Sequence, residues 1–247
     1  MSAAAEHHGP LDQFSIQRIV EIDLGGFDVS FTNSAMMMVI AVVAITMLMT
    51  MSVRTRRLVP TRMQSIAESL YELVARMLDD NVGPEGRKYF PFIFSLFMFL
   101  LFGNALGLIP YAFTYTSHIV VTFMFAAIVF IGVTLIGLII HKHRFFLFFV
   151  PQGVPIFLMP LLVPIEIVSY LARPISLAVR LFANMMAGHT MLHVFGGFVF
   201  ALGFLGFAPF AFIIALYALE SIVAFLQAYV FAILSCLYLR DAIHMHH

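Results

Sequence analysis

The chain has 247 residues, of which 62% are hydrophobic and only 11% are charged, and its formal net charge at pH 7 is zero. Soluble domains carry roughly 25% charged residues, so the composition predicts an integral membrane protein and gives no electrostatic footprint for nucleic acid. The single cysteine, Cys236, excludes an internal disulfide and has no metal-ligand spacing around it. No internal repeat is visible, which argues against an inverted-repeat transporter, so residues 1–247 are expected to form a single membrane domain.

The N-terminal part divides into a polar segment and a first span. Residues 1–28 are polar and mildly acidic, and they lack both the basic start of a signal peptide and the Arg- and Ser-rich pattern of a transit peptide. Residues 31–53 contain no charge, which is long enough for one transmembrane helix. Arg54, Arg56 and Arg57 follow this span, and the positive-inside rule therefore predicts a cytoplasmic end here and an N-terminus outside.

A surface helix and two more spans are expected next. In residues 62–80, apolar side chains recur at steps of three and four while charged ones fill the other side, which predicts an amphipathic helix on the cytoplasmic surface. Residues 90–140 contain no Asp, Glu, Lys or Arg and have room for two spans. Pro110 and the polar residues 114–118 mark the turn between them. Asn104 is expected to form an interhelical hydrogen bond or to line a water path.

The C-terminal third predicts a long helical hairpin over residues 164–239. Residues 145–163 are apolar but interrupted by three prolines, so no regular span is expected there. Helices over 164–195 and 209–239 would each be about 45–50 Å long, whereas the hydrocarbon core is about 30 Å thick, so both must tilt strongly or kink. The predicted fold class is an all-α integral membrane protein with about five membrane helices, the last two forming this strongly tilted hairpin, plus one amphipathic surface helix.

Nearly all of the intramembrane polar side chains lie in the hairpin. A fold-back near Gly203 would place Arg180 level with Gln227, and His189 level with Glu220, on opposite helices. Residues at equal depth on antiparallel helices can contact each other, so polar groups are expected to meet at two depths in the membrane.

The cytoplasmic end of the hairpin is expected to hold a third polar group. The same register places Glu166 opposite Asp241 and His244. Glu166 and Arg180 share one helical stripe, and they are separated by about 20 Å along the helix axis.

Arg180 carries the central functional hypothesis. A guanidinium stays protonated at physiological pH, and placing it inside a bilayer costs at least ~2.5 kcal/mol, so it needs an anionic partner. No carboxylate is expected at its level in this chain, which predicts a carboxylate on another protein. His189 can exchange a proton near neutral pH and lies beside Glu220, so the two indicate an outer proton-transfer site. A fixed cation between two offset acid–base sites would serve as the stator for a moving carboxylate carrier.

Other interpretations of these side chains stay open. Gln227 could make only an interhelical hydrogen bond, His189 and Glu220 could form a silent structural pair, and Arg173 could be a snorkelling cation. His189 and His193, four residues apart, could suggest metal or haem ligation. However, two ligands on one helix do not clamp a haem, and no histidines are expected to face them from the other helix. No cofactor and no metal are therefore expected.

Three segments of the hairpin resemble a known family. They are PIEIVSY at residues 164–170, RPISLAVRLFANMMAGH at 173–189 and LQAYVF at 226–231. These strings are similar to subunit a of rotary F-type ATP synthases, the membrane stator beside the c-ring. GNALGLIP at 103–110 and the amphipathic segment at 62–80 extend the resemblance over most of the chain beyond its N-terminus.

The resemblance implies a role for each group of polar residues. Arg180 is similar to the family's arginine that meets the c-ring carboxylate and prevents proton leak, and Asn184 and Gln227 resemble its polar companions at the rotor interface. His189 and Glu220 resemble the pair of the outer half-channel.

The resemblance also implies an inner half-channel. Glu166 is similar to its acidic residue, and Asp241 and His244 are expected on the same inner side. Proton transport is favoured over sodium transport, because His189 suits proton transfer and no oxygen-rich cage for sodium is visible.

The implied function is that of the proton-translocating stator subunit, with no bond chemistry of its own. The implied partners are the c-ring, the peripheral stalk subunit b, protons and the lipid bilayer. The implied location is a bacterial cell inner membrane, with a periplasmic N-terminus and a cytoplasmic C-terminus, and the mitochondrial inner membrane is the alternative. The alternative function is a self-contained secondary transporter or anion channel that uses Arg180 as the counter-charge of its substrate. A third interpretation, a quinone- or haem-binding subunit, lacks paired ligand histidines.

Overall fold

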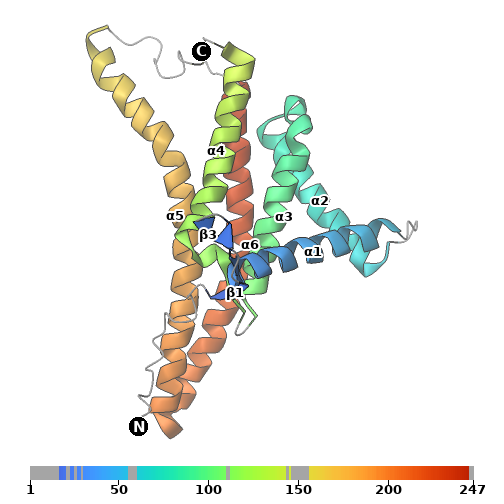
Figure 1. Cartoon of the computed structure of the whole chain (residues 1–247), viewed down its shortest axis with the longest axis vertical. Helices are drawn as coiled ribbons and strands as arrows, with labels where there is room; N and C mark the ends of the chain where they lie inside the picture. The colour runs from blue at the N-terminus through green and yellow to red at the C-terminus, as the bar shows by residue number, and fades with distance from the viewer. Residues whose placement is uncertain are drawn as a thin grey trace.

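The protein is a bundle of long helices with a small strand region at its N-terminal side (Figure 1). The computed structural model describes residues 17–20, 23–24, 27–28, 30–54, 60–109, 112–142, 145 and 156–244. Five helices in this part of the chain are long and apolar enough to cross a membrane: α1 (Asn33–Arg54), α3 (Phe90–Gly107), α4 (Ile119–His141), α5 (Met159–Ala201) and α6 (Phe207–Ile243). A sixth, α2 (Arg62–Asn81), is amphipathic. The predicted all-α membrane architecture is confirmed.

Two small antiparallel strand pairs precede α1. β1 (Arg18–Val20) pairs with β4 (Phe31–Thr32), and β2 (Asp23–Leu24) pairs with β3 (Phe27–Asp28). The side chain of Asn33 accepts hydrogen bonds from the backbone N–H groups of Ser34 (2.9 Å) and Gln17 (3.3 Å), and so ties the strand region to the start of α1. Residues 1–16 of the expected polar segment lie outside the described residues.

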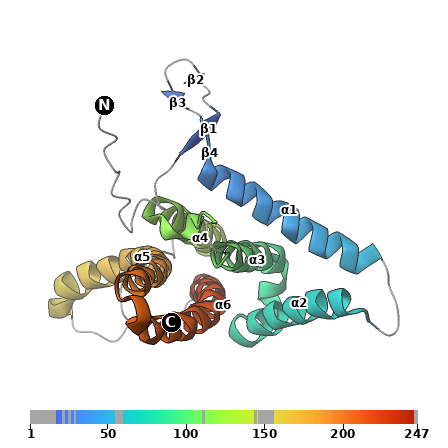
Figure 2. The ribbon, with the colours of Figure 1, turned by 90° about the horizontal axis from the view of Figure 1, so that it is seen from below.

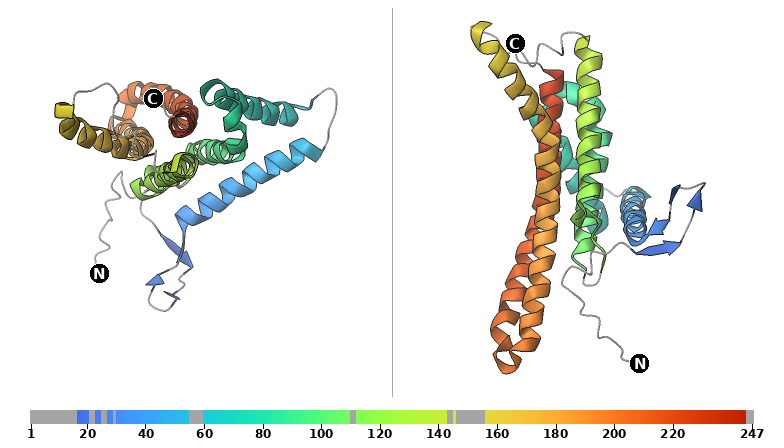
Figure 3. Two further views of the ribbon diagram at one scale, coloured as in Figure 1. Left: turned by 90° about the horizontal axis from the view of Figure 1, so that it is seen from above. Right: turned by 60° about the vertical axis from the view of Figure 1, so that its left-hand side comes forward.

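Helix α1 runs across the long axis of the α5–α6 hairpin instead of beside it (Figures 1 and 3). Its 22 residues span about 33 Å, which matches the ~30 Å hydrocarbon core. Val43 and Met47 are more than half exposed, as expected of a helix facing lipid. The arginines at 56 and 57 lie outside the described residues. Helix α1 therefore has the length to cross the bilayer along its normal.

Helix α2 has the amphipathic character that residues 62–80 predict. Thr61 is its N-cap and accepts a hydrogen bond from the backbone N–H of Gln64 (3.4 Å). On the outer face, Arg76 pairs with Glu72 at 2.6 Å. The inner face packs against α3 and α6 and buries Ala67, Val74, Met77 and Leu78. The short 3₁₀ helix η2 (Pro84–Tyr89) then leads into α3.

The hairpin of α5 and α6 is present and longer than predicted. Helix α5 begins at Met159, five residues before the predicted start, because Pro160 falls in the first turn, where its missing N–H is not needed. Its 43 residues span about 65 Å, roughly twice the hydrocarbon thickness. The 3₁₀ turn η6 (Gly203–Gly206) joins it to α6, and Gly203 adopts a φ of 55° that favours glycine. The N-terminal end of α5 extends away from α6 (Figure 3).

Helix α6 lies among α5, α4, α3 and α2 (Figure 2). Small side chains recur along it and are all buried, at Ala224, Ala228, Ala232 and Ser235. Small residues let neighbouring helix backbones approach closely. The approach of α3 and α5 places Glu220, Gln227 and Ser235 of α6 inside the protein rather than against lipid.

Candidate functional site

The hairpin brings polar side chains together at three levels. From the turn inward, His189 meets Glu220, Asn184 meets Gln227, and Arg173 meets Asp241. The register differs from the predicted one, in which Arg180 is level with Gln227. The prediction assumed that paired residues lie at strictly equal depth, whereas side chains also reach along the helix axis. Asn184, one turn away from Arg180, therefore pairs with Gln227.

The outer level is a buried chain of three side chains from three elements. His189 Nδ1 of α5 lies 3.0 Å from Glu220 Oε1 of α6. The other ring nitrogen, Nε2, is 2.8 Å from the Thr114 hydroxyl in the connection between α3 and α4. Glu220 and Thr114 are 5% and 3% exposed. Neither Glu220 oxygen makes an aligned hydrogen bond in the described part of the chain, so the 3.0 Å approach is a close acid–base contact.

Glycines make room for both partners of His189. A Cβ added to Gly188 would lie 2.7 Å from Glu220 Oε1, and a Cβ added to Gly107 would lie 2.5 Å from Thr114 Oγ1. Real Cβ atoms do not approach other atoms so closely, so a larger residue at either position would displace the partner.

The middle level holds Arg180, Asn184 and Gln227. Arg180 and Asn184 are both exposed at the surface of α5. Asn184 Nδ2 donates a hydrogen bond to Gln227 Oε1 at 2.8 Å, and Gln227 Nε2 is buried without a partner among the described residues. Within the same residues Arg180 forms no ion pair with any carboxylate. The guanidinium is therefore open to a partner outside the chain.

The inner level differs most from the prediction. Arg173 pairs with Asp241 at 2.9 Å, and its guanidinium lies 5.5 Å and 5.3 Å from the ring centroids of Tyr170 and Tyr238. Glu166 lies two turns further out on α5 and is exposed. Because Arg173 already pairs with a residue in the last turn of α6, Glu166 extends past the end of that helix and does not join Asp241.

His244 is also separate from Glu166. Its Nε2 lies 3.2 Å from the Val82 carbonyl oxygen and 4.0 Å from Glu85 Oε2, at the junction of α2 and η2. The predicted group of Glu166, Asp241 and His244 is thus not formed. Asp241 pairs with Arg173 instead, and His244 at the C-terminal end of α6 contacts Val82 at the end of α2.

The α3–α4 connection folds onto the hairpin, which the sequence did not predict. Asn104 of α3 donates from Nδ2 to the Ala224 carbonyl of α6 at 3.1 Å, the interhelical hydrogen bond expected for it. Tyr217 of α6 donates to the Leu108 carbonyl at 2.9 Å. In the connection itself, His118 stacks on Phe113, and burial lowers the pKa of His118. The only sequence signal for Thr114 is its place in the polar stretch 114–118.

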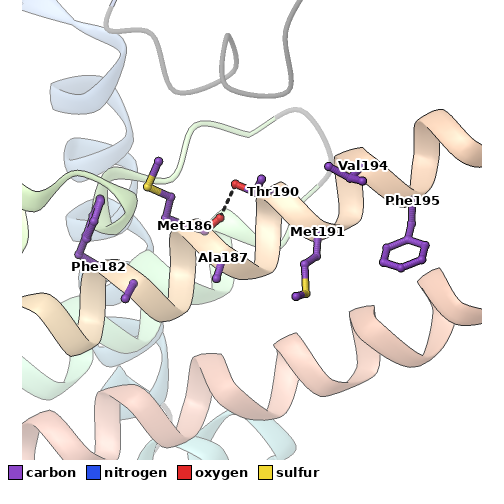
Figure 4. Close-up of a pocket in the computed structure, with 8 residues that line it drawn as sticks. Phe182, Met186, Ala187, Thr190, Met191, Val194 and Phe195 are labelled. Atoms are coloured by element: carbon purple, nitrogen blue, oxygen red, sulfur yellow. Dashed lines mark hydrogen bonds between the residues drawn. The ribbon is translucent and has the colours of Figure 1, made fainter.

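A pocket of about 600 Å³ lies along α5 but does not contain this chemistry (Figure 4). Phe182, Met191 and Phe195 line it with other apolar side chains. Its one hydroxyl, on Thr190, is bonded to the carbonyl of Met186 in the same helix. In the described part of the chain, no group of three or more His, Cys, Asp or Glu side chains could hold a metal ion.

The family model described as ATP synthase A chain matches residues 34–240. The chain belongs to the ATP synthase A chain family. Proteins named ATP synthase subunit a are similar over nearly their whole length. The one from Paramagnetospirillum magneticum is 57% identical over 244 residues, covering 96% of this chain and 99% of the relative. The one from Parvibaculum lavamentivorans is 54% identical over 260 residues, covering all of both chains, and that from Rhodospirillum rubrum is 52% identical over 240 residues, covering 97% and 100%.

Membership in the ATP synthase A chain family confirms the resemblance carried by the hairpin strings. The matched residues run from the start of α1 to the last turn of α6. They include the outer and middle levels and Arg173 of the inner level, and they end one residue before Asp241. The bacterial relatives and the five candidate spans identify a multi-pass membrane protein. A self-contained transporter or a haem-binding subunit is not supported by this family.

Proposed function

We propose that this chain is the proton-translocating stator subunit of an F-type ATP synthase and that Arg180 is the fixed cation that meets the rotor's carboxylate. The observation that carries the proposal is the exposed guanidinium of Arg180, which lies in a membrane helix and has no carboxylate partner among the described residues. A cation in this position requires an anion from another chain, because an unpaired charge in the hydrocarbon region is costly.

The contrast with Arg173 strengthens this assignment. Both arginines lie on α5, seven residues apart. Arg173 is neutralised by Asp241 and enclosed by two tyrosine rings. Arg180 keeps its charge available, so a moving carboxylate would meet one open cation on this helix. That cation favours the ionised carboxylate, and hence the release of its proton before it passes.

Acid–base groups lie on both sides of this cation. His189 is nine residues further along α5, about 13 Å by helical rise, and with Glu220 it would load protons from the outer side. Glu166 is fourteen residues in the other direction, about 21 Å away, and its exposed carboxylate would receive protons on the inner side. Because the two groups are offset along the hairpin, a proton could cross only on a rotor carboxylate that has moved between them.

The remaining polar residues have supporting roles in this proposal. Asn184 and Gln227 form a hydrogen-bonded pair beside Arg180 and would present the Asn184 amide to the rotor. Asp241 serves as the counter-charge of Arg173, and His244 fastens the end of α6 to the α2 junction, so neither is placed on the proton route.

The proposed partners are the c-ring, the peripheral stalk subunit b, protons and the lipid bilayer. The proposed location is the bacterial inner membrane, with the N-terminus periplasmic and the C-terminus cytoplasmic. The uncharged α3–α4 connection then faces outward, on the same side as His189 and Glu220.

The test is ATP-driven proton pumping by the assembled complex in inverted membrane vesicles. Arg180→Gln, which removes the charge and keeps hydrogen-bonding capacity, should abolish pumping while the complex still assembles. The matched control is Arg76→Gln on the exposed face of α2, where one surface ion pair is worth less than about 1 kcal/mol, and it should pump normally. Normal coupled pumping by Arg180→Gln would refute the proposed role.

A further inference from the structure

The strongest unexplained feature of the outer level is Thr114, which contacts the imidazole of His189 from the α3–α4 connection. Its hydroxyl lies 2.8 Å from His189 Nε2 and 3.4 Å from the carbonyl oxygen of Gly107. The side chain is 3% exposed. A buried hydroxyl placed between a ring nitrogen and a carbonyl can donate to either one.

We propose that Thr114 is a positioning residue for proton entry: its hydroxyl holds the His189 ring against Glu220 in both protonation states of the ring. This inference rests on the proposed function, because it concerns the outer proton route of the same site. The hairpin alone provides His189 and Glu220, and the α3–α4 connection adds Thr114 as a third side chain of the outer level.

The two arrangements of the hydroxyl follow from the chemistry of imidazole. When Nδ1 carries the proton toward Glu220, Nε2 is an acceptor, and Thr114 donates to it. When Nε2 is protonated, it donates to the threonine oxygen, and the hydroxyl hydrogen turns to the Gly107 carbonyl. The ring therefore needs no flip to take up a proton at one nitrogen and release one at the other. Valine at this position would remove the hydroxyl contact to Nε2 in both states.

The position of Thr114 is built into the fold. Gly107 leaves the space that Thr114 occupies, since a Cβ there would lie 2.5 Å from its hydroxyl oxygen and 2.6 Å from its methyl carbon. Ser117 donates to the Thr114 carbonyl at 2.5 Å. Tyr115 is 1% exposed and donates to the Phe99 carbonyl at 2.9 Å, which anchors the connection to α3.

Several titratable groups surround this contact. Glu220 approaches from α6 and His193 lies one turn along α5, while Tyr115 and His118 flank Thr114 in the connection. Thr114 itself does not titrate, so replacing it by valine changes no charge. A change in the response to outside pH must then come from the handling of the His189 ring.

The experiment measures ATP synthesis by the purified complex in liposomes after an acid–base jump. The pH of the outer-side compartment is varied while the membrane potential is held constant. The variants are Thr114→Val and Thr114→Ser. The matched control is Thr122→Val, because Thr122 is also buried and, among the described residues, its hydroxyl bonds only to the backbone carbonyls of His118 and Ile119 at the start of its own helix.

Slow proton entry should raise the proton concentration needed for half-maximal synthesis. We expect Thr114→Val to shift the half-maximal pH downward by about one unit, a tenfold change equivalent to one lost hydrogen bond to a charged group. Its rate should approach that of the unmodified complex in the most acidic compartment. Thr114→Ser and Thr122→Val should keep the original midpoint.

Each contrary outcome points to a different error. An unchanged midpoint in Thr114→Val, a rate lowered by the same factor at every pH, or a failure of serine to restore the midpoint would overturn the role of Thr114. Failure of the proposed function itself would appear separately, as normal pumping by Arg180→Gln. The inference fails alone if Glu220→Gln shifts the midpoint and Thr114→Val does not.

Discussion

Replacing Gly188 by alanine should displace the Glu220 carboxyl from His189 without unfolding the hairpin. The added Cβ would lie 2.7 Å from Glu220 Oε1 and 3.0 Å from its Cδ, whereas ordinary contacts begin at 3.4 Å. The carboxyl must therefore retreat by roughly 0.7 Å, and misplacement near 1 Å can cost a proton-transfer or other catalytic step up to ~100-fold. Alanine is favoured over glycine in a helix by about 1 kcal/mol, so the helix itself should not be weakened.

The assay is ATP synthesis in inverted vesicles, normalised to the amount of assembled complex. Gly188→Ala should lower the rate by about 10- to 100-fold. Gly196→Ala on the same helix is the matched control, because an added Cβ there has nothing within 4 Å, and it should keep the full rate. A full rate in Gly188→Ala with normal assembly would show that the position of Glu220 is not critical, and the outer site would have to be reassigned.

Two further predictions test the parts that hold the site in place. Asp241→Asn should remove the ion pair between Asp241 and Arg173 and lower the stability of the complex by about 1 kcal/mol, since the pair is partly exposed. Thermal unfolding of the purified complex measures this, and an unchanged midpoint would contradict it. Burial lowers the pKa of His118, so the unfolded state binds more protons below pH 6.5 and stability should fall as the pH drops from 7 to 5. His118→Phe should remove that loss in the same assay, and an equal acid loss in both proteins would refute it.

The positions of the helices could be predicted from the sequence, because they depend on local features: the length of each uncharged stretch and the three- to four-residue spacing of apolar side chains. The span at 31–53 appears as α1, and α2 begins at Arg62, the predicted first residue of the amphipathic helix. The start of α5 was predicted too late, because a proline in the first helical turn does not prevent a helix.

The site could be predicted only in part. The meeting of His189 with Glu220 follows from an antiparallel fold-back, since both lie near the turn, where a register error is small. At the inner end, far from the turn, long side chains reach along the helix axis and shift which residues meet. Arg173 therefore pairs with Asp241, and Glu166 lies beyond the end of α6. Thr114 could not be placed from sequence, because its contact depends on a connection folding back onto a distant helix.

The central claim is that the exposed guanidinium of Arg180 meets a carboxylate on the rotor. Disulfide trapping in native membranes tests this claim most directly. In a Cys236→Ser background, single cysteines would be placed at exposed Asn184 and at Leu177 and Leu181, which are 1% and 0% exposed. The second cysteine would lie beside the carboxylate of the c subunit. The account predicts a cross-link at 184 and none at 177 or 181. Absence of any cross-link in a stably assembled complex would contradict it, and so would equal trapping at the buried positions.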